Sequence, residues 1–390
     1  MLKDRAQKAS VLRLSVRKRW LAQLEVDVEP SQRIDKTKYL LTDIDVMAIA
    51  PSAIGPHSKF LFDCKSSARE SAISRAFWLR GVMARSKSDR GFVVLNDKVS
   101  ISRDHRISAS DLGVTLLHEV EMESFAAGLG VSIAPTDSAA ASIDNWEAFL
   151  AIQAKFPALA DYLTFSRSTY WMTKGAGEQC RKLVGKLRRI RSELDPGKKE
   201  HLAVFGDGLC LFLHAVSEMA ADLFLILLRP ASREEYSDAL LAILYGGYEN
   251  LEAAKKIRRI AIGAVEEEYV SIFPDMPRFE HLIREVLQAP LQALPAALMA
   301  RELAFCQLSG VATTETLREI SAENPYVSKF IFLGASYLAK SLRLPHEFAD
   351  IYNRQVATAQ RLPGAAAEVL PVIPEISVAP VLPAGRRQLS

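Results

Sequence analysis

Two short segments of the sequence carry acidic and basic side chains where they could act on one chemical group. Asp43 and Asp45 lie two residues apart in LTDIDVMAI, and Asp63 and Lys65 lie two residues apart in FLFDCKSS. Side chains two residues apart in a β-strand point to the same face of the sheet. Both segments are rich in β-branched or aromatic residues, as strands are. Each segment is therefore predicted to be a strand with a charged pair on one face.

The turn between these segments determines which charged groups face each other. The linking residues, APSAIGPHS, contain two prolines and a glycine, which mark a turn. A hairpin symmetric about Ile54 places Asp45 opposite Asp63, with Cβ atoms roughly 5 Å apart. The same register places Asp43 opposite Lys65. Two facing aspartates need a compensating cation, and a divalent metal held by both carboxylates would supply it, because hard cations such as Mg²⁺ prefer oxygen ligands.

Two interpretations of this charged face remain open. In the first, Lys65 orients a metal-bound water or helps to deprotonate it, which is the chemistry of phosphodiester hydrolysis. In the second, the face is simply solvated, and Asp43 forms a cross-strand pair with Lys65 that is worth under about 1 kcal/mol.

The surrounding elements are those of a mixed α/β domain. Apolar spacing predicts a helix over residues 8–24, basic on its other side, and a second helix over 71–85. A short helix that stops near Gly113, followed by a buried strand, is predicted within 108–117. The predicted strands cover residues 25–34, 40–50, 58–65 and 91–96. The expected order is α-β-β-β-α-β-α-β.

This pattern resembles the PD-(D/E)xK nuclease superfamily, which includes restriction enzymes, Mrr-like restriction proteins and Holliday junction resolvases. The motif is D-x(17)-D-x-K, and the resemblance extends over roughly residues 8–118. It implies a restriction-endonuclease-like fold, a Mg²⁺ or Mn²⁺ cofactor and duplex DNA as partner. It also implies that Asp45 and Asp63 are metal ligands and that Lys65 is the catalytic lysine. Asp43 is expected to share the metal-binding role.

The same resemblance assigns further residues and exposes one departure. Ser66 or Ser67 would lie beside the site, and Arg75 on the following helix would contact phosphate. Many members also carry a metal-binding glutamate in the first helix, whereas residues 8–24 contain no acid. Glu25 and the later Glu29 follow this helix instead of lying within it, so the number of metals is left open.

The rest of the chain is predicted to be helical. Helical apolar spacing covers 143–165, 176–194, 202–229, 233–246, 249–270, 278–288 and 291–308. We therefore expect an α/β domain over residues 1–138, an all-helical domain over 139–362 and a weakly ordered or partner-binding Pro/Ala-rich tail over 363–390. The helical domain would select the substrate, a protein partner or a second copy of the chain.

Two basic helices could contact a phosphate backbone. The run over residues 174–191 includes Arg188 and Arg189, and the first helix includes Arg17 and Lys18. A basic run is also commonly a solvated helix face. The net charge of +3 by itself says little about partners.

Composition predicts a cytoplasmic protein. The four cysteines have no paired spacing, so neither a disulfide framework nor a CxxC metal site is indicated. The most apolar run, around Met219–Leu228, is interrupted by Asp222 and is too short to span a bilayer.

The sequence thus favours a Mg²⁺-dependent nuclease that acts on DNA, and fusion to a helical module suggests bacterial restriction or phage defence by analogy. The alternative is a nuclease fold that has lost catalysis and serves as a nucleic-acid-binding or scaffold subunit.

Overall fold

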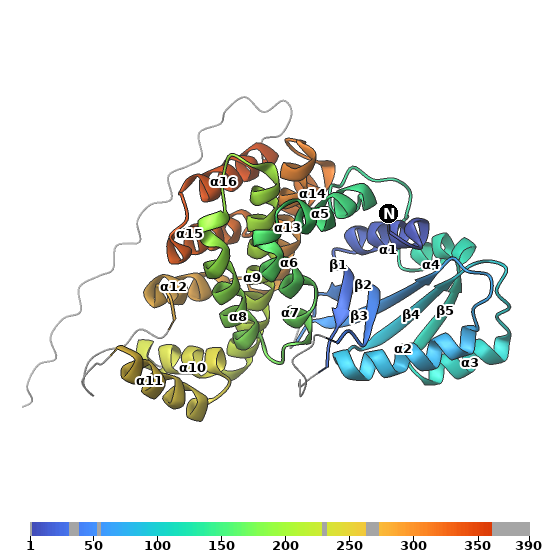
Figure 1. Ribbon diagram of the computed structural model, residues 1–390, viewed down its shortest axis with the longest axis horizontal. Coiled ribbons are helices and arrows are strands. Elements are labelled where there is room, and N and C mark those ends of the chain that lie inside the picture. The colour runs from blue at the N-terminus through green and yellow to red at the C-terminus, as the bar shows by residue number, and fades with distance from the viewer. Residues whose placement is uncertain (1, 31–38, 53–55, 228–231, 263–272, 361–390) are drawn as a thin grey trace, which may run out of the picture. The chain divides into compact units, whose positions relative to one another are not determined.

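The computed structural model describes residues 2–30, 39–52, 56–227, 232–262 and 273–360 (Figure 1). Residues Met1–Gln360 form one compact unit. Some predicted features lie outside the described residues: the tail over 363–390, the centre of the turn at Ile54, and the distal ends of the strand predicted over 25–34 and the helix predicted over 249–270.

Five strands form one mixed sheet in the order β1-β2-β3-β4-β5. The first three are antiparallel, and β3, β4 and β5 run parallel to one another. The element order α1-β1-β2-β3-α2-β4-α3-β5 confirms the predicted order. The strands are β1 Leu21–Val28, β2 Thr42–Ala50, β3 Ser58–Lys65, β4 Arg90–Leu95 and β5 Val114–His118.

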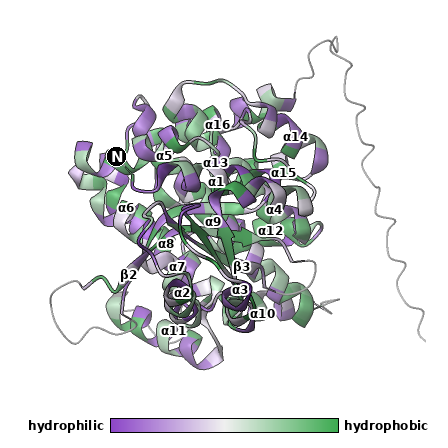
Figure 2. Cartoon of the chain, turned by 90° about the vertical axis from the view of Figure 1, so that its right-hand side faces the viewer, coloured by the Kyte–Doolittle hydropathy of each residue, from purple (hydrophilic) through white to green (hydrophobic). Residues whose placement is uncertain are grey.

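Helices cover both faces of this sheet (Figure 1). One face is covered by α1 (Arg5–Arg17) and α4 (Met122–Gly128), and the other by α2 (Ala72–Ser86) and α3 (Arg103–Asp111). The strands are strongly hydrophobic, whereas α3 is largely hydrophilic on its outer side (Figure 2). A sheet buried on both faces explains the near-continuous apolar strands of the sequence.

The first helix is shorter than predicted. It ends at Arg17 instead of Leu24, and β1 begins at Leu21, four residues before the predicted start of the strand. Arg19 adopts a left-handed backbone (φ 57°), which stops the helix. Residues 21–24 pair with β2 and are buried, and their mostly apolar side chains, interrupted by Gln23, fit a buried strand as well as a helix.

The rest of the described chain is helical, which confirms the predicted fold class. The helix predicted over 143–165 is divided at Pro157 into α5 and α6. The remaining helices are α5 Ile143–Lys155, α6 Ala160–Arg167, α7 Thr169–Met172, α8 Ala176–Ile190, α9 Lys199–Ile226, α10 Arg233–Tyr245, α11 Tyr248–Ile262, α12 Met276–Val286, α13 Ala293–Ser309, α14 Glu315–Glu323, α15 Val327–Leu342 and α16 Glu347–Gln360. Short 3₁₀ turns are η1 Glu119–Glu121, η2 Pro157–Leu159, η3 Arg191–Glu193 and η4 Pro290–Gln292.

Helix α9 is the central element of the helical region and packs most extensively against α13. Helix α9 has 28 residues, and the apolar run around Met219–Leu228 overlaps only its last part. By length and composition alone, the helix is long and apolar enough to cross a membrane. However, 67% of its most apolar window is buried inside the protein, as is also usual for a core helix.

Gly177 allows α8 to pack closely against α10. A Cβ atom there would lie 2.4 Å from the carbonyl oxygen of Ile243, a backbone atom that cannot rotate away. Gly177→Ala is expected to destabilise the protein by about 1–3 kcal/mol, because such overpacking forces the helices apart. The measurement is urea unfolding.

Gly185 provides the matched control on the same helix. Nothing lies within 4 Å of a Cβ at this position. Gly185→Ala is expected to leave stability unchanged or raise it by up to about 1 kcal/mol, through helix propensity. Equal effects of the two substitutions would contradict this account of the α8–α10 contact.

Candidate active site

The three predicted catalytic residues lie together at the end of β3. The strand register is the one predicted, because Val46 pairs with Phe62 and the turn is therefore centred on residue 54. Next to this pair the side chain of Asp45 continues the contact between the strands, since the Cys64 N–H donates to Asp45 Oδ2 at 2.7 Å. Asp45 and Asp63 are both buried, at 4% and 2% exposure.

Three oxygen atoms surround the ammonium group of Lys65. Its Nζ lies 3.0 Å from Asp45 Oδ2 and 2.8 Å from Asp63 Oδ1, and it donates to the Cys64 carbonyl oxygen at 3.0 Å. We call these three oxygens the oxygen cradle. A cation already occupies the cradle, in the form of the lysine side chain. Two carboxylates and a carbonyl are also a donor set that suits a hard divalent cation, with water or substrate oxygens as its other ligands.

A row of alternating charges extends the cradle in both directions. On one side, Lys8 of α1 pairs with Asp45 Oδ1 at 2.8 Å and also with Glu25. On the other side, Arg75 of α2 binds both oxygens of Asp63, at 2.6 and 2.7 Å. We call this the charged row: Glu25, Lys8, Asp45, Lys65, Asp63 and Arg75. Its three carboxylates are matched by three cationic groups.

The charges in this row determine the protonation states of its members. Burial acts to raise the pKa of Asp45, but Lys65 and Lys8 outweigh it, so this pKa lies below its ordinary value. Burial acts to lower the pKa of Lys65, but Asp63 and Asp45 outweigh it, so this pKa is raised well above its ordinary value. Lys65 is therefore protonated at neutral pH, and it supplies positive charge instead of accepting a proton.

The other residues predicted to lie at the site have different surroundings. Asp43 is exposed and pairs across the sheet with Asp27 of β1, whereas Lys65 has Asp45 and Asp63 as its partners. Ser66 donates to Asp4 through both its N–H (2.7 Å) and its hydroxyl (2.5 Å).

Two further predicted nucleic-acid contacts flank the cradle. Ser67 is exposed beside it, and its hydroxyl accepts from the N–H of Arg69. Arg75 is bound to Asp63 and lies over the ring of Trp78, 4.0 Å from its centroid, so in this structure it orients a carboxylate.

The other four basic residues predicted to contact nucleic acid lie on parts of helices that are not next to the cradle. Arg17 and Lys18 are at the opposite end of α1 from Lys8, roughly 13 Å along the helix. They contact Glu319 and the carbonyl of Leu129 respectively. Arg188 and Arg189 are exposed on α8, whose buried face includes Leu183, Val184, Leu187 and Ile190.

Sequence reasoning missed three residues at the site: Lys8, Glu25 and Gln7. Glu25 had been set aside because it follows the first helix, yet the pairs Leu24↔Val46 and Val26↔Ile44 place it opposite Asp45. Gln7 is 1% exposed, and its amide donates to the Lys65 carbonyl at 3.1 Å. Its Oε1 is buried without a hydrogen-bond partner among the described residues. Polarity within an apolar segment was a signal for Glu25 alone, because Gln7 and Lys8 follow the charged residues Lys3, Asp4 and Arg5.

The ligand count at the cradle is low. Within the described ranges, no group of three or more His, Cys, Asp or Glu side chains is arranged to hold a metal ion. A divalent cation at the cradle would therefore take two carboxylates and a backbone carbonyl from the protein. This is compatible with Mg²⁺, which usually keeps several waters.

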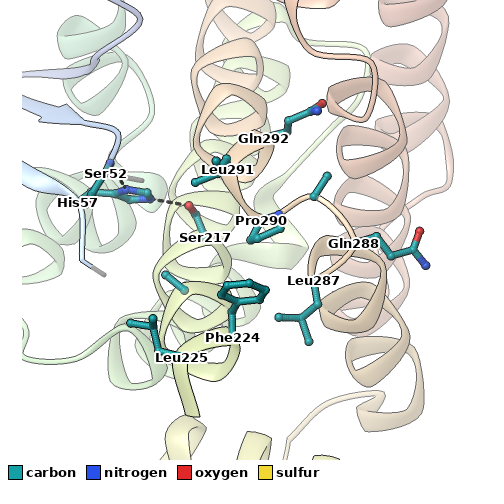
Figure 3. A pocket seen from close by; sticks show the side chains of 12 residues that line it. Ser52, His57, Ser217, Phe224, Leu225, Leu287, Gln288, Pro290, Leu291 and Gln292 are labelled. Carbon is teal, nitrogen blue, oxygen red and sulfur yellow. Dashed lines mark hydrogen bonds between the residues drawn. The ribbon is translucent and has the colours of Figure 1, made fainter. Parts of the chain in front are cut away.

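A separate cavity of about 470 Å³ lies near the opposite end of β3, roughly 20 Å from the cradle along the strand (Figure 3). His57 extends from the sheet to Ser217 of α9, with 2.6 Å between Nε2 and Oγ. The Ser52 N–H donates to His57 Nδ1, so Nε2 carries the proton and donates to Ser217. The histidine does not act as a base toward this serine. The apolar lining of the cavity is formed by Ala221, Phe224, Leu225, Leu287, Ala289, Pro290 and Leu291.

Glu218, next to Ser217 on α9, gives the protein a predictable pH dependence. Burial raises its pKa to about 7, from 4.5 in the unfolded chain, while the His57 N–H hydrogen bond opposes this rise. The raised pKa favours folding fully below about pH 4.5, and this contribution is lost as the pH rises through 7. The unfolding free energy of the wild type, measured relative to that of the Glu218→Gln variant, should therefore fall by up to about 3 kcal/mol between pH 4.5 and 8.

The check is urea unfolding at several pH values, with exposed Glu234→Gln as the control. A wild-type curve parallel to that of Glu218→Gln would contradict the assignment.

The fold and the site together define a class of protein: a mixed five-stranded sheet domain with a buried carboxylate–lysine cluster at the end of a central strand, followed by a helical region. Comparison with family models, curated proteins and solved structures found no match for this chain.

Proposed function

We propose that the protein is a metal-dependent nuclease that hydrolyses phosphodiester bonds in DNA. The observation that carries this proposal is the oxygen cradle: Asp45 Oδ2, Asp63 Oδ1 and the Cys64 carbonyl converge within 3.0 Å of one cation, the Lys65 ammonium. Mg²⁺ or Mn²⁺ is the expected cofactor, because all three donors are oxygens.

The residues of the charged row have distinct roles in this proposal. Lys8 and the Cys64 N–H fix the orientation of Asp45, and Arg75 fixes that of Asp63. A bound divalent cation would polarise a phosphoryl oxygen and lower the pKa of its water ligand. The side chain of Lys65 is 23% exposed, and its ammonium, displaced from the cradle by the metal, would stabilise negative charge on the phosphate.

The topology supports the same proposal. The order α1-β1-β2-β3-α2-β4 is the one expected over the region that resembles PD-(D/E)xK nucleases. The exposed residues Ser67 and Arg69 border the cradle and would meet the phosphate backbone. The helical region would then select the DNA or a protein partner, in cytoplasmic restriction or phage defence.

A second function is favoured by one specific observation. The charged row is balanced without a metal, since Lys8, Lys65 and Arg75 already pair with its three carboxylates. An ion-pair cluster of this kind would also suit a nuclease fold that has lost catalysis and serves as a nucleic-acid-binding or scaffold subunit.

Cleavage of nucleic acid distinguishes the two functions. The full chain is incubated with supercoiled plasmid, linear duplex DNA and single-stranded RNA, in Mg²⁺, Mn²⁺ or EDTA. We expect metal-dependent cleavage of DNA by wild type and by the exposed control Asp111→Asn, and none by Asp63→Asn. Cleavage that persists in EDTA or in Asp63→Asn would contradict the proposal, as would the absence of cleavage with every substrate.

A further inference from the structure

Lys8 occupies the half of the charged row that the oxygen cradle does not use. Its side chain is 2% exposed, although lysine is almost never fully buried unless it is paired. Its Nζ lies 2.8 Å from Asp45 Oδ1 and also contacts Glu25. Asp45 thus directs its two oxygens to different cations, Oδ2 to the cradle and Oδ1 to Lys8.

The backbone of β1 is distorted at the residue that completes this pairing. Glu25 has a left-handed backbone (φ 53°) within the strand, which costs a non-glycine residue roughly 1–2 kcal/mol. The neighbouring pairs Leu24↔Val46 and Val26↔Ile44 keep the register of the strand on both sides. The distortion is therefore local, and it accompanies the placement of the Glu25 carboxylate against Lys8.

We propose that Lys8 limits the site to one divalent cation by occupying the space between Glu25 and Asp45. The inference rests on the proposed function, because it takes the cradle to be a metal site. Lys8 is a fixed cation in this role: it neutralises two carboxylates that would otherwise attract a second hard cation, and it is a positioning residue for Asp45. The second cation would be of the same chemical class, Mg²⁺ or Mn²⁺.

The argument depends on charge and space together. With Lys8 present, a second divalent cation at Asp45 Oδ1 would lie in contact with a buried ammonium, and this repulsion is only weakly screened. With Lys8 replaced by a neutral side chain, the buried Asp45 and the half-buried Glu25 would be two neighbouring carboxylates without their shared counter-ion. Buried charges left in this way are costly unless a cation binds.

The test counts bound Mn²⁺ on the full chain by electron paramagnetic resonance of free Mn²⁺, without nucleic acid. We expect one Mn²⁺ per chain for wild type and for Lys8→Arg, which keeps the charge. We expect two for Lys8→Met and one again for Lys8→Met with Glu25→Gln. Lys8→Gln, which keeps a hydrogen-bond donor, is measured in parallel, so that misfolding of Lys8→Met does not decide the result.

The outcomes separate this inference from the proposed function. One Mn²⁺ in wild type and still one in both neutral variants would overturn the inference and leave the nuclease proposal intact. None in wild type but one in the neutral variants would overturn both, because the cradle would then hold no metal ion for Lys8 to limit to one. None in any variant would overturn both.

Discussion

Replacing Lys65 with methionine is expected to reduce metal-dependent DNA cleavage by at least about 100-fold while strengthening Mn²⁺ binding. The rate falls because the variant lacks the positive charge proposed to stabilise the phosphate in the transition state, a contribution typically worth about 10²–10³ in rate. Metal binding strengthens because the Lys65 ammonium, held by Asp45, Asp63 and the Cys64 carbonyl, no longer competes for the cradle. The measurements are initial rates of plasmid nicking and a Mn²⁺ titration.

Lys98→Met is the matched control for this substitution. Lys98 is exposed and follows β4, next to β3 in the sheet, so the variant loses the same charge without disturbing the cradle. It is expected to retain cleavage and Mn²⁺ affinity within about twofold, because an exposed charge is screened by solvent and salt. Weaker Mn²⁺ binding by the Lys65→Met variant would contradict the view that the Lys65 ammonium and the metal ion compete for the cradle.

Replacing Arg301 with leucine is expected to destabilise the protein by about 3–5 kcal/mol, the largest effect on stability that the structure predicts. Arg301 of α13 is 1% exposed and pairs with Asp207 of α9, which is equally buried. It also donates to Gln23 of β1 at 3.0 Å, so one side chain connects the helical region to the sheet. The variant leaves Asp207 as a buried carboxylate without its cationic partner, although the Tyr162 hydroxyl still donates to it.

Urea unfolding measures this effect, and two further variants test its cause. Asp207→Asn combined with Arg301→Leu removes the unpaired charge and should recover a substantial part of the lost stability. Arg354→Leu, at an exposed position on α16, is expected to change stability by no more than about 0.5 kcal/mol. An Arg301→Leu variant as stable as Arg354→Leu would contradict this account of the buried pair.

The strand register at the site could be predicted because it depends on local rules. Side-chain alternation and the position of the turn determine which faces of two neighbouring strands meet. These rules placed Asp45, Asp63 and Lys65 correctly relative to one another. The same rules did not determine how far the pairing extends: the β2–β3 ladder begins at Val46↔Phe62, so the predicted pair of Asp43 with Lys65 lies beyond it, and Asp43 pairs with Asp27 on the β1 side of the strand.

The cationic partners of the aspartates could not be predicted from the sequence. Lys8 precedes Asp45 by 37 positions and reaches it from a helix that packs on the sheet, a contact set by tertiary structure. The compensating cation that we expected to be a metal is supplied in this structure by side chains, and periodicity alone contains no information on such contacts. The predicted end of the first helix was wrong for a related reason. Residues 21–24 form a buried strand, and a buried strand can have the same largely apolar composition as a helix.

The most direct test of the central claim is to locate Mn²⁺ by anomalous diffraction in crystals of the full chain soaked with this ion. Our account predicts one peak within coordination distance of Asp45 Oδ2, Asp63 Oδ1 and the Cys64 carbonyl, with the Lys65 side chain displaced from its present position. Crystals with no peak there, and with Lys65 still bound to both aspartates at saturating Mn²⁺, would contradict it and favour the scaffold function.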